Sequence, residues 1–596
     1  MTAAAEGTAR HGAAPGGRDP DLLAAVQAWA VTDVDLDDAA LALAAAHDSG
    51  EARAGLGDAW TGSLQFGTAG LRGAMGPGPN RMNRSVVVRA AAGLAAYLLE
   101  QVGATVEAPL VVVGHDARHR SAVFATDSAA VLTAAGCRVV LLPAALPTPV
   151  LAYAVRRLGA DAGVMVTASH NPKDDNGYKV YLGGRVSPGS GEGVQIVPPA
   201  DRDIAARIAA APAPVHVPRA GEGWQVADDS LVDGYVAAVV GLLPPGPRGL
   251  RVVTTALHGV GQDVLARVLA GAGVTDVTPV AEQAEPDPEF PTVPFPNPEE
   301  EGALDLALAL AARTGADLVV AVDPDADRCS VAVPDPARGP ADVVASWRRL
   351  TGDEVGALLV EHVLTRDPAP VPPDPDQPPT VACSMVSGSL LHRVAAAHGV
   401  RSVATLTGFK WIARVPGLVM GYEEAIGYCV APSVVRDKDG ISTALLLVEL
   451  AAAARVGGGS LLDRLDALAQ RHGVHLTAPV TLRLDDMSVI GPVLARLLTH
   501  PPTDLAGTPV TAVEDLAAGV DGLPATTGVR LTASPGTTGA TARVVVRPSG
   551  TEPKLKAYLE VVEPVVEPVA ADLVRARAAA QERLLRLQEQ VRGLLG

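Results

Sequence analysis

Three aspartates at alternate positions, Asp323, Asp325 and Asp327, form the most specific chemical pattern in the sequence. Carboxylates spaced in this way along an extended loop point to one side and can converge on a hard cation. Because neither His nor Cys accompanies them, the ligand set favours Mg²⁺ over Zn²⁺. An EF-hand is excluded, since its glycine and distal glutamate are missing, and the alternative to a cation site is a solvated acidic turn. Arg328 follows directly and could pair with a carboxylate or a phosphate.

A second segment, T-A-S-H-N-P-K-D-D-N-G-Y-K over 167–179, places Ser169 beside His170 directly after a predicted buried strand. Open α/β sheets present ligand-binding residues at the carboxyl ends of their strands. A serine next to a histidine is typical of a nucleophile or a phosphoryl acceptor. The segment is not a G-x-S-x-G elbow, so a hydrolase triad is not expected. Taken alone, it could also be an ordinary polar turn.

Three further loops carry polar groups. R-P-S-G-T-E-P-K over 547–554 offers an arginine fork, hydroxyls and backbone N–H groups after a predicted strand, a set suited to holding phosphate. G-Y-E-E-A-I-G over 421–427 places adjacent carboxylates in a glycine-flanked loop, where they can accept hydrogen bonds from sugar hydroxyls. F-G-T-A-G-L-R-G over 66–73 carries Arg72 but lacks the Walker lysine, so it is not a P-loop. Each loop also has an alternative without a function: an ordinary turn for 547–554, surface acidic residues for 421–427 and a structural loop for 66–73.

Lysine usage points to the same places. Only six of the 48 basic residues are lysines, and they fall in four short segments: Lys173 and Lys179, Lys410, Lys438, and Lys554 and Lys556. Arginine does not replace lysine where a compact ammonium or a proton carrier is needed. The clustering therefore indicates site segments, with chance as the alternative.

These segments follow alternating strand and helix patterns. Predicted strands at 109–114, 138–143 and 162–167 flank a helix at 121–135 in a βαβ rhythm. The rhythm recurs twice, with strands at 250–255, 316–322 and 380–384 and helices at 264–270, 354–364 and 390–398. After residue 480 the strands at 481–484, 529–532 and 542–547 alternate like exposed antiparallel strands, before a long helix at 569–595.

The patterns predict three similar α/β domains and one α+β domain, preceded by a tail and a helical stretch at 22–47. The expected intervals are 1–54 for the N-terminal extension, 55–225, 226–340 and 341–475 for the α/β domains, and 476–596 for the α+β domain. A triplicated pattern is visible, although the three units share no clear repeat of residue identities.

Composition narrows the classes of protein. With 596 residues, 48% of them hydrophobic and 19% charged, the chain is not of the disordered kind. A net charge of -18 argues against nucleic-acid and anionic-membrane binding. Four distant cysteines without a C-x-x-C pair indicate a reducing compartment. No secretory signal is evident, and the apolar run at 139–155 contains three prolines, so we expect a cytoplasmic protein without a membrane span.

In order along the chain, T-A-S-H-N-P, D-P-D-A-D-R, G-Y-E-E-A-I-G and R-P-S-G-T-E-P-K form a specific set that resembles the α-D-phosphohexomutase superfamily, which includes phosphoglucomutases and phosphomannomutases. G-H-D-A-R at 114–118, T-A-L-H-G-V-G at 255–261 and L-T-G-F-K-W at 406–411 support the resemblance, which covers most of the chain. It implies an α/β fold of three topologically similar α/β domains plus a C-terminal α+β domain, similar to the TATA-binding protein, around a central cleft.

The resemblance also implies roles for residues of this sequence. Ser169 would be the phosphoserine, holding one Mg²⁺ per active site together with Asp323, Asp325 and Asp327. Arg72, His170 and Lys179 would surround the transferring phosphoryl group, with His170 and Lys179 as candidate proton carriers. The residues implied in substrate binding are Arg328, Lys410, Glu423, Glu424, Arg547, Ser549, Gly550 and Thr551.

The implied reaction is the interconversion of a sugar 1-phosphate and its 6-phosphate through a bisphosphorylated sugar, which also serves as activator. Glucose is expected first, with mannose and a pentose as alternatives. Phosphoglucomutases commonly carry a serine two residues after the first glutamate of the sugar loop, where this chain has Ala425. The E-E-A-I-G loop looks closest to the branch that includes bacterial phosphoglucomutases and phosphopentomutase-type enzymes. An Mg²⁺-dependent phosphatase and an inactive binding protein are the alternatives of other classes, and a monomer or a small homo-oligomer is expected.

Overall fold

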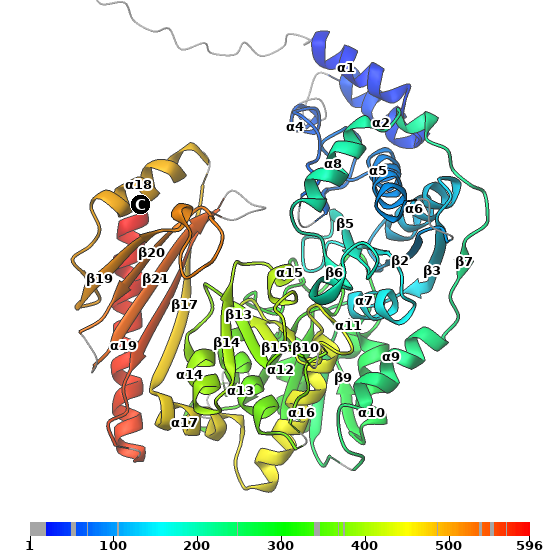
Figure 1. Ribbon diagram of the computed structural model, residues 1–596. Helices are drawn as coiled ribbons and strands as arrows, with labels where there is room; N and C mark the ends of the chain where they lie inside the picture. Colours follow the sequence, from blue (N-terminus) through cyan, green and yellow to red (C-terminus); the bar gives the residue numbers. More distant parts are fainter. Residues whose placement is uncertain are drawn as a thin grey trace, which may run out of the picture.

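The computed structural model describes residues 20–48, 55–67, 70–103, 107–246, 248–338, 346–367, 369–373, 376–484, 487–535, 539–548, 554–567 and 569–596. Four sheets organise this part of the chain, and they follow one another along the sequence. Figure 1 shows the first sheet and the last sheet at opposite ends of the molecule, with the second and third sheets between them.

The first sheet has the order β1-β5-β4-β2-β3-β7, and β6 pairs with β5. Its strands are β1 (Leu71–Ala74), β2 (Leu110–His115), β3 (Arg138–Ala145), β4 (Ala162–Val166), β5 (Asp175–Leu182), β6 (Val194–Gln195) and β7 (Gln225–Val226). Its helices are α5 (Arg84–Val102), α6 (Ser121–Ala134), α7 (Thr148–Arg157) and α8 (Ala200–Ala210).

The second sheet has the order β12-β11-β10-β8-β9, and the third β14-β13-β15-β16. The second unit contains α9 (Ser230–Val240), β8 (Arg251–Thr255), α10 (Gln262–Gly271), β9 (Asp276–Pro279), α11 (Ala281–Ala284), α12 (Asp305–Thr314), β10 (Leu318–Val322), β11 (Cys329–Pro334) and β12 (Trp347–Arg349). The third contains α13 (Gly352–Thr365), β13 (Thr380–Ser384), α14 (Leu390–Ala397), β14 (Arg401–Thr405), α15 (Phe409–Ile412), β15 (Leu418–Glu423), β16 (Gly427–Cys429), α16 (Gly440–Val456) and α17 (Leu461–His472).

One strand order recurs in all three α/β sheets, which confirms the predicted triplication. In the first sheet, β2 runs parallel to β3 and β4, while β5 returns antiparallel to β4. The second sheet repeats this pattern with β9-β8-β10-β11, and the third with β14-β13-β15-β16. The loop before each returning strand carries, in turn, Ser169, the three aspartates, and Glu424 with Ala425. Three of the predicted site segments therefore occupy equivalent places in three domains.

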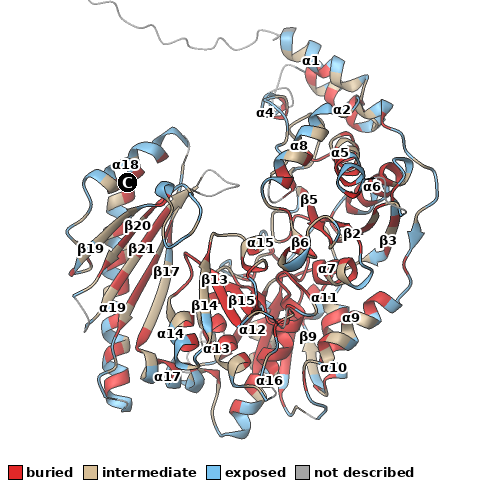
Figure 2. Ribbon diagram, viewed as in Figure 1, coloured by how far each residue is buried: buried red, intermediate tan, exposed pale blue. Residues whose placement is uncertain are grey.

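The central strands are buried on both faces because helices cover them. Strands β4, β10 and β13 are buried at every position, and Figure 2 shows β10, β13 and β15 in the buried centre of the molecule. This burial on both faces explains why these strands are mainly apolar, most clearly β10, which contains only Leu, Val and Ala. Among the described residues, α5 is long and apolar enough to cross a membrane, but it packs into the core of the first domain beside α6 and α8.

The fourth sheet is antiparallel, in the order β17-β22-β21-β20-β19-β18. Its elements are β17 (Val474–Arg483), α18 (Ile490–Thr499), β18 (Asp504–Leu505), β19 (Thr508–Asp515), β20 (Val529–Ala533), β21 (Thr541–Pro548), β22 (Lys554–Glu563) and α19 (Ala570–Leu595). α19 packs on β17 and β22. The alternating pattern of the sequence and the long terminal helix are thus as predicted.

The N-terminal extension differs from the single helical stretch expected at 22–47. It forms α1 (Pro20–Ala30) and α2 (Leu36–His47), followed by the short α4 (Leu56–Ala59). Asp35 interrupts the helix because its carboxylate accepts from the N–H groups of Asp37 and Asp38 and caps α2. Arg120 then fixes the extension to the first domain, donating to Asp38 Oδ1 and Oδ2 at 2.9 and 2.6 Å.

The domain intervals remain predictions. Two short strands lie at or across the expected boundaries. Strand β7 crosses the expected boundary at 225/226, and β12 lies within the expected interval 341–475 although it pairs with β11 in the second sheet. The chain therefore passes between neighbouring domains through short edge strands.

A close backbone approach gives a test of the first sheet. Gly183 follows β5, and a Cβ at this position would lie 1.5 Å from the carbonyl oxygen of Ala160. We expect Gly183→Ala to force β4 and β5 apart and to destabilise the first domain by about 1–3 kcal/mol. Gly491→Ala in α18 is the matched control, since nothing lies within 4 Å of its added Cβ and alanine favours a helix. Calorimetric unfolding measures both variants, and an unchanged melting profile for Gly183→Ala would contradict the packing described.

Candidate active site

Asp323, Asp325 and Asp327 form a buried cluster in the β10–β11 loop. One carboxylate oxygen of each lies within 4.8 Å of the others, and all three residues are fully buried. Ala326 in this loop has φ 56°, so the chain turns sharply enough to aim the three carboxylates together. An uncompensated buried carboxylate costs several kcal/mol, so the cluster must find positive partners.

Two lysines from different domains supply that compensation. Lys179 on β5 donates to Asp325 Oδ2 at 2.7 Å and to Asp327 Oδ2 at 2.8 Å. Lys438, between β16 and α16, donates to Asp327 Oδ2 at 2.6 Å. Burial lowers the pKa of Lys179, but the adjacent carboxylates of Asp325 and Asp327 outweigh it, and the pKa lies above its ordinary value. Lys179 is therefore protonated in this arrangement, and the cluster joins three domains.

The residues fit a hard cation. Asp325 Oδ1 and Asp327 Oδ1 are buried and have no hydrogen-bond partner in the described part of the chain. Burial, followed by the charges of Asp325 and Asp327, raises the pKa of Asp323. A divalent cation would satisfy the two unpartnered oxygens and relieve the repulsion that raises this pKa.

Ser169 lies at the same point of the site, at the end of β4. Its φ of 54° is in the left-handed region, which is rare for serine and turns its side chain toward the second domain. Ser169 Oγ donates to Asp323 Oδ2 at 2.6 Å and lies 3.2 Å from His170 Nδ1. Its backbone N–H donates to Thr167 Oγ1 at 2.8 Å. A phosphoryl group on this oxygen would face the aspartate cluster directly.

Arg118 stabilises the conformation of the serine loop through hydrogen bonds to its backbone. Its guanidinium donates to the carbonyl oxygens of Ser169 and Pro172 at 2.7 Å each, and also to those of Asn171 and Asp175. The side chain is buried, and its guanidinium lies 5.0 Å from the ring centre of Phe290. Four carbonyls bound to one planar fork fix the loop more firmly than turn residues alone.

His170 and Arg72 line the open side of the serine. Burial, followed by the positive charges of Arg328 and Arg72, lowers the pKa of His170 well below its ordinary value, so the imidazole is neutral at pH 7. Arg72 on β1 donates from Nη1 to Asn171 Oδ1 at 3.2 Å. The site thus combines a neutral ring nitrogen, which can accept a proton, with a cation beside the serine.

The loop of Glu423 and Glu424, which the sequence predicts to recognise the sugar, lies between β15 and β16. Arg328 spans from the aspartate loop to it, with its N–H on Asp323 Oδ1 at 2.9 Å and Nη1 on the carbonyl oxygen of Ala425 at 3.0 Å. Glu423 Oε1 accepts from the N–H of Gly408 at 2.7 Å. Burial, then the neighbouring charge of Glu423, raises the pKa of Glu424 to about 7. The second and third domains are thereby linked at the site.

Two more predicted residues lie on the side of the third and fourth domains. Burial lowers the pKa of Lys410 to about 8, against an opposing contribution from Glu423. Arg547, at the end of β21, donates from Nη1 to Thr407 Oγ1, one residue before Gly408. The structure therefore places Arg547 beside the loop that Glu423 holds. Ser549, Gly550 and Thr551 lie outside the described residues.

Comparison with known proteins decides the family. Residues 63–213, 233–338 and 351–472 match the alpha/beta/alpha domains I, II and III of the phosphoglucomutase/phosphomannomutase family, and residues 536–576 match its C-terminal domain. The chain belongs to this family. Its members are phosphomutases, so the protein is an isomerase that moves a phosphoryl group.

Curated relatives of this phosphomutase carry different sugar names. A "Probable phosphomannomutase" of Haemophilus influenzae is 42% identical over 80% of this chain and 93% of its own length. The phosphopentomutase of Homo sapiens is 32% identical, covering 84% and 85% of the two chains. A phosphoglucomutase of Staphylococcus haemolyticus is also 32% identical, covering 86% and 92%.

A solved structure supports the fold of the phosphomutase. A phosphoglucomutase/phosphomannomutase family protein from Burkholderia thailandensis superposes with a TM-score of 0.62 at 21% identity, covering 87% of this chain and 96% of that one. The match extends over all four domains, so the arrangement of sheets is that of the family.

The structure adds contacts that the sequence did not predict. Lys438 lies in a segment marked by lysine usage, but nothing local shows that its ammonium reaches Asp327. Arg118 belongs to the G-H-D-A-R match, yet its contacts join residues about 50 positions away. Thr148 Oγ1 donates to Asp325 Oδ2 at 2.6 Å from the start of α7, without any sequence signal.

Arg118 is expected to act as a positioning residue. Replacing it with methionine removes the four hydrogen bonds from its guanidinium to the carbonyls of the serine loop, and misplacing Ser169 by about 1 Å is expected to lower kcat about 10²-fold. Arg118→Lys should not restore activity, since one ammonium cannot bind four carbonyls. Arg138→Met is the control, because Arg138 is an exposed partner of Glu107. Hydrogen exchange of the peptide over 167–175 should rise in both Arg118 variants, and unchanged exchange would contradict this role.

Proposed function

We propose that the protein interconverts a sugar 1-phosphate and its 6-phosphate, with glucose as the first substrate to test, through a phosphorylated Ser169 and a bisphosphorylated sugar. The observation that supports this most directly is the 2.6 Å contact of Ser169 Oγ with Asp323 inside a buried acidic cluster faced by Lys179 and Lys438. Phosphoryl transfer requires positioning and charge neutralisation rather than covalent assistance.

The proposed transfer uses groups of this chain. The bond between Ser169 Oγ and phosphorus breaks while a sugar hydroxyl oxygen forms a bond to the same phosphorus, and the electron pair of the broken bond stays on Ser169 Oγ. Neutral His170 takes up the hydroxyl proton and passes it to Ser169 Oγ, 3.2 Å from its Nδ1. Lys179, and Arg72 with its guanidinium, offset the charge on the phosphoryl oxygens as cations. The bisphosphorylated sugar then turns over and returns its other phosphate to Ser169. Arg547, Ser549, Gly550 and Thr551 are proposed to hold whichever phosphate is not reacting.

We propose one Mg²⁺ at Asp323, Asp325 and Asp327, because these carboxylates fit a hard cation and leave two oxygens unpartnered. When bound, Mg²⁺ supplies charge neutralisation for the phosphoryl oxygens. Asp323 orients the Ser169 side chain even without it, through the 2.6 Å Ser169–Asp323 contact.

Sugar identity is proposed to depend on the loop of Glu423 and Glu424. Ala425 offers no hydroxyl at a position where phosphoglucomutases commonly have serine, and relatives are named for mannose, pentose and glucose substrates. Mannose 1-phosphate is therefore the second candidate, and a pentose 1-phosphate the third. We also propose that the protein is cytoplasmic and is a monomer or a small homo-oligomer. Its partner is proposed to be a small-molecule substrate and not nucleic acid or a membrane.

A comparison of kcat/KM among three sugar 1-phosphates tests both the proposed phosphoryl transfer and the identity of the sugar. With Mg²⁺ and a trace of the matching bisphosphate, we expect a higher kcat/KM for glucose 1-phosphate than for mannose or ribose 1-phosphate. Ser169→Ala is expected to lower turnover on the best sugar by about 10³-fold or more. Ser187→Ala, a hydroxyl that binds Arg414 away from the cluster, is the control. A ribose preference would replace the proposed hexose, while turnover without Ser169 would refute the phosphoserine route.

Lys410 predicts a pH dependence of substrate binding. Its ammonium form exists below its pKa of about 8 and is lost above it. We expect KM for the sugar phosphate to rise between about pH 7.5 and 9.5, because the cation near the substrate phosphate disappears. Lys410→Arg should keep KM flat over this range, since arginine stays charged. An equal rise in wild type and Lys410→Arg would assign the pH dependence to another group.

A further inference from the structure

A second cavity lies at the junction of the third and fourth domains, away from the serine and the aspartates. Its volume is about 410 Å³, within the range of small-molecule sites, and domain junctions are a frequent place for such sites. One wall comes from β12 and the start of α13, and the other from β17 and α19. The cavity therefore touches both the domain of the sugar loop and the domain that carries Arg547.

Basic residues dominate its charged lining. Four arginines line it, including Arg348 and Arg349 on β12 and Arg577 on α19, against two acidic residues, Asp353 and Glu354. Arg338, Arg348 and Arg577 each pair with one carboxylate, of Asp335, Glu354 and Asp466. What the lining offers an anion is therefore the donors of the guanidinium forks that these pairs leave unused.

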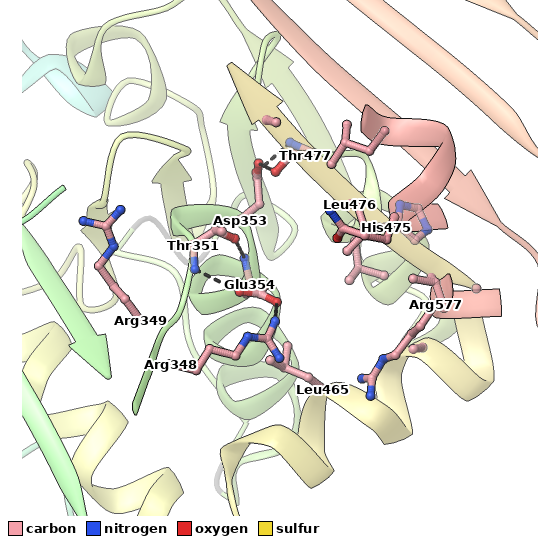
Figure 3. A pocket seen from close by; sticks show the side chains of 18 of the residues that line it. Arg348, Arg349, Thr351, Asp353, Glu354, Leu465, His475, Leu476, Thr477 and Arg577 are labelled. Carbon is pink, nitrogen blue, oxygen red and sulfur yellow. Dashed lines mark hydrogen bonds and ion pairs between the residues drawn. The ribbon is translucent and has the colours of Figure 1, made fainter. Parts of the chain in front are cut away.

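The arginine forks retain binding capacity. Arg348 binds Glu354 through Nη2, and Arg577 binds Asp466 through Nη2. Among the described residues, no other hydrogen bond is made by either side chain, and the two side chains are 26% and 39% exposed. Figure 3 shows Arg348 beside Glu354, with Arg577 across Leu465 from it. Two planar donors from two domains match the oxygen atoms of phosphate groups.

The apolar part of the lining restricts the kind of anion. Leu465, Leu476 and Leu584 lie among the lining residues. Such a surface suits the carbon skeleton of a small organic phosphate. The N-terminus of α13 is already capped by Thr351 and Glu354, so the arginines rather than the helix end provide the anion recognition.

The cavity is also connected to the sugar loop. Asp353, on its wall, accepts from Tyr422 Oη at 3.0 Å and from Thr477 Oγ1 at 2.7 Å. Tyr422 directly precedes Glu423 on β15, while Thr477 belongs to β17 of the fourth domain. A ligand held between the two walls would therefore stabilise one placement of the fourth domain relative to the sugar loop.

We propose that this cavity is a regulatory binding site for a small phosphorylated anion, held by Arg348 and Arg577 and distinct from the site of phosphoryl transfer. The proposal does not depend on the identity of the sugar substrate or on turnover. Its ligand class is defined by two arginine forks, an apolar strip and a volume that admits a molecule of monosaccharide to mononucleotide size.

Calorimetric titration of the full chain with pyrophosphate, without added divalent cation, tests the site. We expect a binding component, separate from any binding at the proposed substrate site, that Arg577→Met weakens about tenfold or more. Arg586→Met is the matched control, since Arg586 lies on the same helix in an exposed pair with Glu582 and does not line the cavity. Arg547→Met should also retain this component, because Arg547 belongs to the proposed substrate site.

A second variant separates loss of binding from loss of folding. Gln581→Trp fills the cavity without removing an arginine, and it is expected to abolish the same component while its melting temperature stays near that of wild type. Absence of binding in the wild type would overturn the proposal. A component lost in Arg547→Met but retained in Arg577→Met and Gln581→Trp would overturn it as well, by assigning the anion to the substrate site. Because binding is measured directly, failure of the proposed mutase reaction would not affect these outcomes.

Discussion

The need to compensate three buried carboxylates organises the molecule. Asp323, Asp325 and Asp327 cannot be ionised in the interior without positive partners, and those partners come from other domains. Lys179 arrives on a strand of the first domain, and Lys438 on a loop of the third. Removing either lysine would leave uncompensated charge, so the relative placement of three domains and the electrostatics of the site are one and the same constraint.

Repetition of one topology makes this convergence possible. In each α/β sheet the last strand returns antiparallel, and the loop before it lies at the edge where parallel strands end. Three copies of this loop, facing one another, bring a serine, a set of carboxylates and a sugar loop to one place. Backbone strain at Ser169 and the buried fork of Arg118 then refine a position that the topology already provides approximately.

Local patterns predicted the parts of the site that are local. The aspartate spacing, the serine–histidine pair and the βαβ rhythm each depend on neighbouring residues, and the structure brings the first two together at 2.6 Å. Lys438 and Thr148 were missed as partners because their contacts depend on how domains pack, which no window of sequence contains. The break between α1 and α2 was missed for a different reason, since apolar spacing continues through Asp35 although its carboxylate favours a cap over a helix interior.

The reaction can be inferred with fewer alternatives than the identity of the sugar, because the two depend on different kinds of contact. The groups proposed to handle the phosphoryl group, the three aspartates with Lys179 and Lys438, are charged, buried and mutually compensated, so substituting one of them disturbs the others. The loop proposed to bind the sugar has no such set of compensated charges at Ala425, which accepts one hydrogen bond from Arg328 through its carbonyl oxygen. Exchanging a hydroxyl there alters about one hydrogen bond, of the order of 1 kcal/mol, without changing the charge balance. The names of the relatives, which refer to mannose, glucose and pentose substrates, agree with our proposal that the sugar is selected at this loop and not at the aspartate cluster.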